Sequence, residues 1–367
     1  MRIPFADLKR GTDALREELD AAVARVLDSG WYVLGNEGRA FEREFANFVG
    51  RGSAVGVASG TDAIELALLA LGIGPGDEVV TQANTCVPTV AGIERTGATA
   101  VLCDVEPDAA TMDPESLRGA IGPHTRAIVP VHLYGQCADV DAILDVAGAI
   151  PVVEDCAQAH GAELRGRRAG TMGALGCFSF YPTKNLGALG DGGAVTTGDD
   201  QLAERLRLLR QYGQADRYQH VDRGVNSRLD ELQAALLRVK LPHLSRWNER
   251  RAEIAAAYDD ALAGAAARPL ERLPKRRHIF HLYVVEVSGR DAFQAHLADA
   301  GIATLVHYPH PVHGHEPYRA LGEGPVSLEH SERLSSRIVS LPVYPELRDD
   351  EVEQVRRSVR EASAACV

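Results

Sequence analysis

Residues 152–161 read Val-Val-Glu-Asp-Cys-Ala-Gln-Ala-His-Gly, and residues 179–193 read Ser-Phe-Tyr-Pro-Thr-Lys-Asn-Leu-Gly-Ala-Leu-Gly-Asp-Gly-Gly. The first stretch carries Asp155 and the second carries Lys184, and each follows an apolar run that is typical of a buried strand. Open α/β sheets bind their ligands at the carboxyl ends of strands. We therefore expect Asp155 and Lys184 to face one binding site.

The two side chains have complementary chemistry. A lysine amine forms a Schiff base with an aldehyde, and a carboxylate can keep a pyridine nitrogen protonated so that the ring accepts electrons. The pair therefore predicts a pyridoxal phosphate (PLP) site. Taken singly, Asp155 also suits a turn or a helix cap, and Lys184 suits a solvated loop.

A candidate phosphate site lies earlier in the chain. Residues 54–57 predict a short strand, Ser59-Gly60-Thr61-Asp62-Ala63 follows, and residues 64–71 predict a helix. Small residues at a helix start leave backbone N–H groups free for an anion, which the helix dipole also favours. The alternative is an ordinary helix cap by Ser59 or Thr61.

The order of predicted elements gives the fold class. Strand-like and helix-like segments alternate from about residue 53 to 200, which indicates an α/β domain with a mostly parallel sheet. A helical run over residues 229–241 stops at Pro242. Beyond it, residues 280–287 predict a strand, and residues 291–300 and 346–364 predict helices. We expect a large domain over residues 1–240, including an N-terminal arm, and a smaller α+β domain over 241–367.

A dinucleotide-binding domain is the first alternative. Its fingerprint needs G-x-G-x-x-G between a strand and a helix. Residues 72–76, Gly-Ile-Gly-Pro-Gly, precede a strand instead, and the glycines of residues 187–193 have the wrong spacing. The sequence therefore disfavours a nicotinamide cofactor.

The composition of the chain indicates which kinds of binding partner and cellular location to expect. The 367 residues include 51 acidic and 39 basic ones, and a net charge of −12 argues against nonspecific nucleic-acid binding. The six cysteines form no CxxC pair, so neither a zinc ribbon nor a dithiol motif is indicated; they are Cys86, Cys103, Cys137, Cys156, Cys177 and Cys366. Reduced thiols, the absence of a signal-like start and the lack of a long apolar stretch favour a cytoplasmic protein without a membrane span.

The ordered motifs resemble those of the DegT/DnrJ sugar-nucleotide aminotransferases. The resemblance runs through nearly the whole chain. It is carried by the residues at 30–35, 59–63, 131–135, 154–161, 178–187, 224–235 and 306–309. It implies the type I, aspartate aminotransferase-like PLP fold and a homodimer with shared active sites.

The resemblance also implies cofactor contacts. Lys184 would hold PLP and move the proton between substrate and cofactor carbons. Asp155 would pair with the pyridine nitrogen, and Gln158 would contact the side of the ring that bears the hydroxyl. The phosphate would be held by Thr61, Asp62, Ser179 and, from the neighbouring subunit, Asn226. Without the resemblance, Asn226 also suits a helix cap.

One position departs from the family pattern. Many relatives place an aromatic residue where residues 82–88, Gln-Ala-Asn-Thr-Cys-Val-Pro, carry Cys86. That aromatic stacks on the pyridine ring. We expect Cys86 to border the cofactor, while the residue that packs on the ring stays open.

The substrate residues follow from the same resemblance. The loop His-Tyr-Pro-His-Pro-Val-His-Gly-His at 307–315 suggests a metal site, but its two prolines and missing carboxylates argue against one. The resemblance implies that His307 and Tyr308 contact the sugar nucleotide, with His313 behind them. Tyr181 and Tyr32 are further candidates, and a structural role is the alternative for both.

The predicted reaction is transamination of a nucleotide-linked keto sugar with glutamate as donor. The segment 185–193 resembles that of the C3 aminotransferases of deoxysugar pathways, which predicts a dTDP-linked 3-keto-6-deoxyhexose. A C4 aminotransferase and a noncatalytic regulatory protein on the same fold are the alternatives. Side-chain chemistry alone decides neither the nucleotide nor the sugar's stereochemistry.

Overall fold

A largely parallel sheet forms the centre of the larger part of the molecule. The computed structural model describes residues 2–365, so Cys366 lies outside the described residues. The sheet segments β1-β9-β8-β5 and β3-β2-β4 are joined by parallel bridges from Ile128 to Val152 and from Val131 to Asp155. Only β9 runs antiparallel to its neighbours. The predicted α/β class with a mostly parallel sheet is confirmed. The strands are β1 (Ser53–Val57), β2 (Glu78–Gln82), β3 (Thr99–Cys103), β4 (Thr125–Val129), β5 (Val153–Asp155), β8 (Leu175–Ser179) and β9 (Gly193–Thr197).

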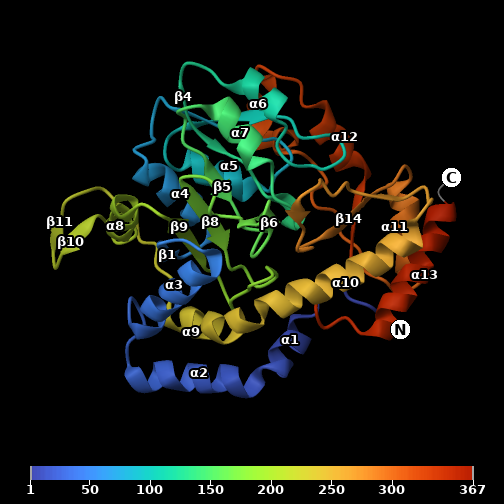
Figure 1. The fold of residues 1–367 in the computed structure, drawn as a ribbon, viewed down its shortest axis with the longest axis horizontal. Coiled ribbons are helices and arrows are strands. Elements are labelled where there is room, and N and C mark those ends of the chain that lie inside the picture. The colour runs from blue at the N-terminus through green and yellow to red at the C-terminus, as the bar shows by residue number, and fades with distance from the viewer. Residues whose placement is uncertain (1, 366–367) are drawn as a thin grey trace.

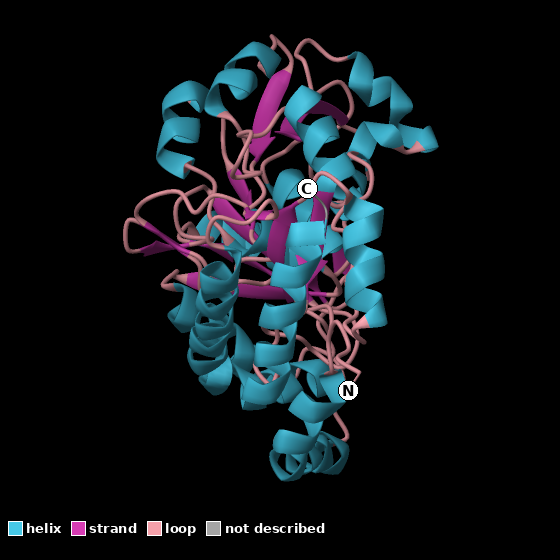
Figure 2. Ribbon diagram, turned by 90° about the vertical axis from the view of Figure 1, so that its right-hand side faces the viewer, coloured by secondary structure: helices cyan, strands magenta, loops and turns pink. Residues whose placement is uncertain are grey.

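Helices cover both faces of this sheet (Figures 1 and 2). Successive strand residues pack to opposite sides: Cys177 joins the core under α4, α5 and α8, whereas Phe178 joins the core under α3 and α9. At the far end of the sheet, α6 and α7 cover the second face. The helices are α3 (Asn36–Val49), α4 (Gly60–Ala70), α5 (Val87–Glu94), α6 (Pro114–Ala120), α7 (Val140–Ala147), α8 (Asp200–Leu209) and α9 (Glu231–Lys240).

A second, smaller core lies toward the C-terminus. It packs the sheet β12-β14-β15 against helices α10, α11 and α13. Ile3 belongs to this core, because its backbone pairs with Ile302. The elements are β12 (Arg268–Pro269), β14 (Tyr283–Glu286), β15 (Ile338–Leu341), α10 (Leu244–Leu262), α11 (Arg290–Asp299), α12 (Glu329–Arg337) and α13 (Asp349–Ala365).

Strand β14 is shorter than the predicted run from 280 to 287. Phe280 has a positive φ of 48°, and the His281 ring contacts Asn185 of the large part at 3.1 Å. The N–H of Leu282 donates to the Tyr134 carbonyl at 3.2 Å. Contacts with the large part therefore take residues 280–282 out of the strand.

Helices α9 and α10 lie end to end across the molecule (Figure 1). The predicted stop at Pro242 is a 3₁₀ turn, η2 (Leu241–His243), after which α10 begins at Leu244. Proline is tolerated in a first turn, where its missing N–H costs no helical bond. The two helices together form a nearly continuous α9–α10 rod that spans both parts of the chain.

Several shorter helices and strands complete the fold. Helices α1 (Leu8–Ala14) and α2 (Arg16–Ser29) precede α3, and the short strands β6 (Glu163–Leu164), β7 (Arg167–Arg168) and β13 (Arg276–Arg277) form a small sheet. The hairpin β10 (Gln214–Asp216) and β11 (Gln219–His220) projects from the body in Figure 1. Among residues 2–365, every helix is too short or too polar to cross a bilayer.

Candidate active site

Asp155 ends β5 as a buried carboxylate. Its two oxygens accept hydrogen bonds from the Thr89 hydroxyl at 2.9 Å and from the Ala157 N–H at 3.0 Å. Burial raises the pKa of Asp155 even though these bonds favour the charged form. A cationic N–H placed against this carboxylate would compensate its desolvation.

Lys184 lies in the turn between β8 and β9, where its N–H donates to the Tyr181 carbonyl at 2.8 Å. Lys184 is half-buried, and desolvation lowers the pKa of its amine. The nearby Asp155 carboxylate and Cys86 thiol oppose this shift. A lowered pKa increases the fraction of neutral amine, which is the nucleophilic form.

The start of α4 forms an anion cradle. Ser59 caps the helix by accepting from the Asp62 N–H at 3.1 Å, so the N–H groups of Gly60 and Thr61 precede the first intrahelical bonds. A Cβ added to Gly60 would lie 2.6 Å from the Cβ of Ser179. The glycine therefore lets the helix start approach the end of β8, where Ser179 presents its hydroxyl.

The side chain of Asp62 is engaged elsewhere. Its carboxylate accepts from Arg95 at 2.9 Å and from the Ser227 hydroxyl at 2.7 Å. A phosphate at the helix start would meet the backbone of Asp62 rather than this anionic group. Asp62 thus ties the segment around Ser227 to the cradle.

Gln158 connects two tyrosines. Its Oε1 accepts from the Tyr134 N–H at 2.7 Å, and its Nε2 donates to the Tyr308 hydroxyl at 3.1 Å. The Tyr308 hydroxyl also lies against the Cys86 thiol, and burial raises the pKa of both groups. Gln158, Tyr308 and Cys86 are thereby brought into one cluster with Lys184 and Asp155.

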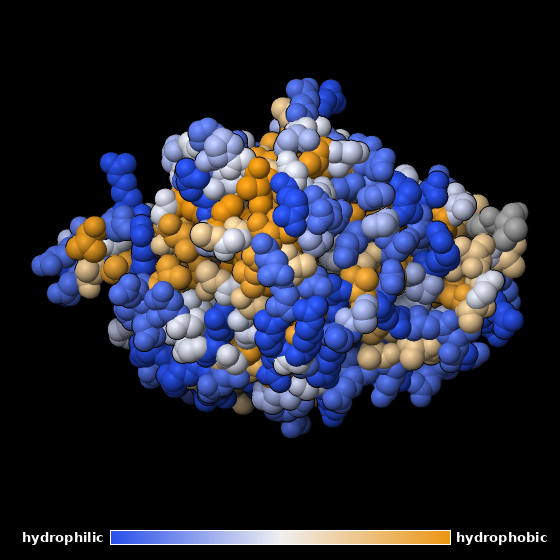
Figure 3. Space-filling model, turned by 45° about the horizontal axis from the view of Figure 1, so that its top comes forward, coloured by the Kyte–Doolittle hydropathy of each residue, from blue (hydrophilic) through white to orange (hydrophobic). Residues whose placement is uncertain are grey.

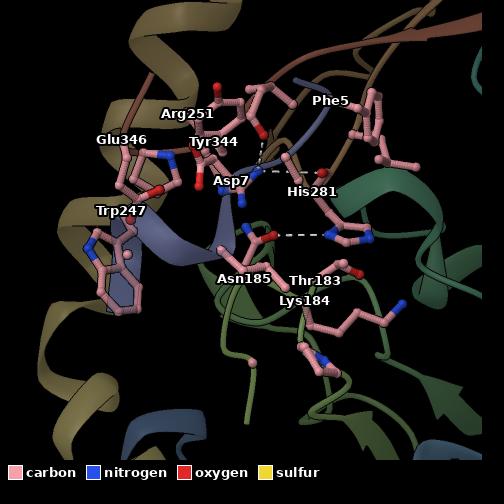
Figure 4. A pocket seen from close by; sticks show the side chains of 18 of the residues that line it. Phe5, Asp7, Thr183, Lys184, Asn185, Trp247, Arg251, His281, Tyr344 and Glu346 are labelled. Atoms are coloured by element: carbon pink, nitrogen blue, oxygen red, sulfur yellow. Dashed lines mark hydrogen bonds between the residues drawn. The ribbon is translucent and has the colours of Figure 1, made fainter. Parts of the chain in front are cut away.

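His307 and Lys184 both line a cavity between the two parts of the chain (Figure 4). Nδ1 of His307 lies 2.9 Å from the Ser340 hydroxyl, and its ring lies 5.4 Å from that of Phe5. Burial and, to a smaller extent, the charge of Lys184 together lower the pKa of His307 to about 4. Phe5 also lines this cavity, which its sequence context did not predict, because a short N-terminal segment carries no pattern that indicates a cavity wall.

Three predicted residues face outward in the single chain. Tyr32 and Tyr181 are 50% and 53% exposed, and Asn226 is exposed although its neighbour Ser227 is buried. His313 instead lies 3.0 Å from Glu332 of α12 and packs on Gly322. These contacts of His313 involve none of the residues around Lys184 and give no support to its predicted role.

A buried hydrogen-bond network around Glu154, the residue that precedes Asp155, was also not predicted from the sequence. Glu154 accepts from the N–H groups of Gly170, Met172 and Gly173 at 2.7–2.9 Å, and its Oε2 lies 2.9 Å from Nε2 of His132. Nδ1 of His132 accepts from the Ala138 N–H at 3.1 Å. These bonds occupy the atoms that a metal ion would need, although His132, Glu154 and Cys156 lie close together. A glutamate inside an apolar run was the available sequence signal.

The residues present fit PLP. Asp155 is a buried carboxylate whose desolvation a protonated pyridine nitrogen would compensate, the start of α4 offers backbone N–H groups to a phosphate, and the Lys184 amine lies close enough to Asp155 for the two charges to interact. The fold and this set of groups define a PLP-dependent enzyme of the aspartate aminotransferase type.

Comparison with known proteins identifies the family. The DegT/DnrJ/EryC1/StrS aminotransferase family matches residues 13–360, and the chain belongs to it. The chain is 49% identical over 365 residues to a dTDP-3-amino-3,4,6-trideoxy-alpha-D-glucose transaminase of Streptomyces venezuelae, covering 98% of this chain and 96% of that protein. It is 48% identical to the erythromycin biosynthesis sensory transduction protein EryC1 of Saccharopolyspora erythraea, covering 97% and 98%. A crystal structure of DesV from S. venezuelae superposes with a TM-score of 0.96 at 49% identity, covering 99% and 98%. The predicted family, aminotransferase class and cofactor are confirmed.

Proposed function

We propose that the protein transfers an amino group from glutamate to C3 of a dTDP-linked 3-keto-6-deoxyhexose. The observation that carries the proposal is the pairing of the buried Asp155 carboxylate with Lys184, which lines a cavity together with His307. Bound PLP would supply an electrophilic carbon and an electron sink for the transfer. The relatives named above support a sugar nucleotide as substrate.

The chain's own residues then have distinct tasks. Lys184 binds the cofactor through its amine and afterwards carries the proton between the two reacting carbons. Asp155 holds a positive charge on the ring nitrogen. The N–H groups at the start of α4 and the Ser179 hydroxyl bind the phosphate. Gln158 and Cys86 border the ring, and His307, Tyr308, Tyr181 and Tyr32 contact the substrate.

The most specific part of the proposal is the sugar carbon that receives the amino group. The segment 185–193 resembles that of C3 aminotransferases, and the S. venezuelae relative is named for a 3-amino sugar. Direct competition between 3-keto and 4-keto dTDP-sugars, with glutamate as donor, tests it. We expect kcat/KM to favour the 3-keto sugar, and a clear preference for the 4-keto sugar would reject C3 amination while leaving transamination standing.

A noncatalytic regulatory protein is the second candidate, because one relative carries the name of a sensory transduction protein. The retention of both Asp155 and Lys184 favours the enzyme. A protein that binds PLP through Lys184 should be yellow, and added glutamate should bleach its absorbance. Bound cofactor whose absorbance glutamate leaves unchanged would favour the regulatory alternative.

We also propose a homodimer in the cytoplasm with shared active sites. The exposure of Asn226, Tyr32 and Trp31 in the single chain supports the homodimer. Trp31 is a large side chain with 62% exposure. Apolar surface gathers on the same half of the molecule as the β10–β11 hairpin in Figure 3, and such patches commonly mark interfaces. Light scattering of the purified protein should give twice the chain mass.

We propose, finally, that the chain divides near residue 240 into domains 1–240 and 241–367. The end of α9 at Lys240 supports this boundary, and so does the separate core of the C-terminal part. Ile3 packs into that core, so the N-terminal arm of the larger domain would contact the smaller domain. Limited proteolysis near η2 with intact fragments would support the division, whereas early cleavage inside either domain would argue against it.

A further inference from the structure

Asn248 bonds to two loops of the candidate active site at once. It lies in α10 with 4% of its surface exposed. Its Nδ2 donates to the His160 carbonyl at 2.8 Å, and its Oδ1 accepts from Nδ2 of Asn185 at 2.8 Å. A residue far along the chain therefore cross-links two segments that the sequence keeps apart.

The first segment carries Asp155 and Gln158. It leaves β5 at Asp155 and turns through a hydrogen bond from the Ala159 N–H to the Cys156 carbonyl at 2.9 Å. His160 follows directly, with its ring packed between Phe178 and Phe180. The bond from Asn248 fixes the end of this turn and thereby the backbone that follows Asp155.

The second segment carries Lys184. Asn185 follows it immediately and is buried. Besides its bond to Asn248, Nδ2 of Asn185 donates to the Ile279 carbonyl at 3.2 Å, and its Oδ1 lies 3.1 Å from Nδ1 of His281 (Figure 4). These three partners hold the side-chain amide of Asn185 in place, and the side chain of the adjacent Lys184 extends away from it (Figure 4).

The α9–α10 rod holds the same loop at two further points. Oε1 of Gln233 accepts from the Leu189 N–H at 2.9 Å, and the Lys240 amine donates to the Gly187 carbonyl at 2.7 Å. Neither of these two side chains has a described bond to the Asp155 segment. Asn248 is therefore the member of the rod whose bonds reach both segments.

We propose that Asn248 is a positioning residue that sets the Lys184 amine relative to the Asp155 carboxylate. The proposal rests on the proposed function, in which Lys184 binds the cofactor and Asp155 faces its nitrogen. A shift of about 1 Å at a reacting centre lowers rates by roughly 100-fold. The buried amide of Asn248 resists such a shift because both its donor and its acceptor are used.

Two variants separate its two bonds. Asn248→Asp keeps an acceptor for Asn185 and loses the donor to His160, whereas Asn185→Asp loses the donors to Asn248 and Ile279. The matched control is Ile254→Val, which removes one buried methyl group from α10 in the C-terminal core. For each holoenzyme we would record cofactor absorbance against pH, PLP affinity and thermal stability. For each apoprotein we would record hydrogen exchange of residues 182–189.

Both asparagine variants should shift the pH midpoint of the cofactor absorbance and weaken PLP binding by roughly tenfold, in line with losses at supporting residues of other bound groups. Their apoproteins should exchange residues 182–189 faster. Ile254→Val should lower the melting temperature and change none of these quantities. Wild-type midpoint, affinity and exchange in both asparagine variants would overturn the positioning role alone. Reductive labelling of a lysine other than Lys184 in the wild type would instead overturn the proposed function, and this proposal with it.

Discussion

The Asp155 carboxylate and the Lys184 amine follow neighbouring strands, β5 and β8, and each opposes the effect of burial on the other's pKa. Burial raises the pKa of Asp155 and lowers that of Lys184, so desolvation drives both groups toward neutrality. A protonated pyridine nitrogen would restore the charge on Asp155. The lowered pKa of Lys184 favours its neutral amine, which is the form that attacks an aldehyde.

Asp155→Asn should preserve the fold and lower kcat by about 100- to 1000-fold, the range seen when an electrostatic partner at a reacting centre is lost. Asparagine has the same size, and its Oδ1 can still accept from the Ala157 N–H while its NH2 group donates to the Thr89 hydroxyl. Steady-state kinetics and circular dichroism together check this. A folded variant with near-normal kcat would show that another group faces the ring nitrogen.

Gly60→Ala should weaken PLP binding, because the new Cβ would lie 2.6 Å from the Cβ of Ser179 and 3.1 Å from its Oγ. We expect at least a roughly tenfold rise in the PLP dissociation constant, about 1.4 kcal/mol. Gly74→Ala is the control, because its Cβ would meet only the Thr96 carbonyl at 3.7 Å. Equal affinities for the two variants would argue against a phosphate at the start of α4.

Asn226 should act across the subunit interface. Lys184→Ala and Asn226→Ala homodimers are each expected to be impaired. Subunit exchange between them should create one site with both lesions and one with neither, and so restore part of the activity. Verified exchange without recovery would place Asn226 in the site of its own chain.

Glu154→Gln should destabilise the fold by roughly 1–3 kcal/mol at pH 7, because the uncharged side chain would turn an NH2 group toward N–H donors that now bond to a carboxylate oxygen. Burial alone would raise the pKa of Glu154, but the hydrogen bonds from His132, Gly173 and Gly170 lower it below its ordinary value of 4.5. A lowered folded-state pKa contributes stability above pH 4.5, and this contribution is lost as the pH falls through the folded value.

Urea unfolding from pH 7 to about pH 3 checks this dependence, because the loss begins near pH 4.5 and continues below it. The wild type should lose more stability than Glu154→Gln over the acidic part of the range, so the difference between them should narrow. Glu115→Gln is the control, since the Glu115 side chain is 78% exposed. A constant difference at every pH would mean that Glu154 contributes through packing rather than charge.

Local sequence patterns predicted the frame of the molecule. The strands that end at Asp155 and Ser179 and the helix after Ser59 follow from apolar runs bounded by small and capping residues. Family motifs identified the cofactor and the class of enzyme. The shortened β14 was missed because its first residues make tertiary contacts with Tyr134 and Asn185, which no local pattern encodes.

Contacts between residues far apart in the sequence could not be predicted from local patterns either. Asn248 looks like an ordinary polar residue of an amphipathic helix, yet it bonds to His160 and Asn185. Phe5 contacts the His307 ring, and the nearby Ile3 pairs with Ile302, so both contacts join the N-terminal segment to residues far along the chain. The roles of Cys86, Asn226 and His313 remain predictions, because they depend on a bound cofactor, a substrate or a second subunit.

Borohydride reduction of the holoenzyme, followed by peptide mapping, identifies the lysine that binds PLP. Reduction fixes the cofactor to the amine that holds it, and we expect a pyridoxyl label on Lys184 alone. Lys184→Ala should take up no label and show no turnover, because Lys184 supplies both the binding amine and the proton carrier. A label on another lysine, or full turnover by Lys184→Ala, would contradict the account.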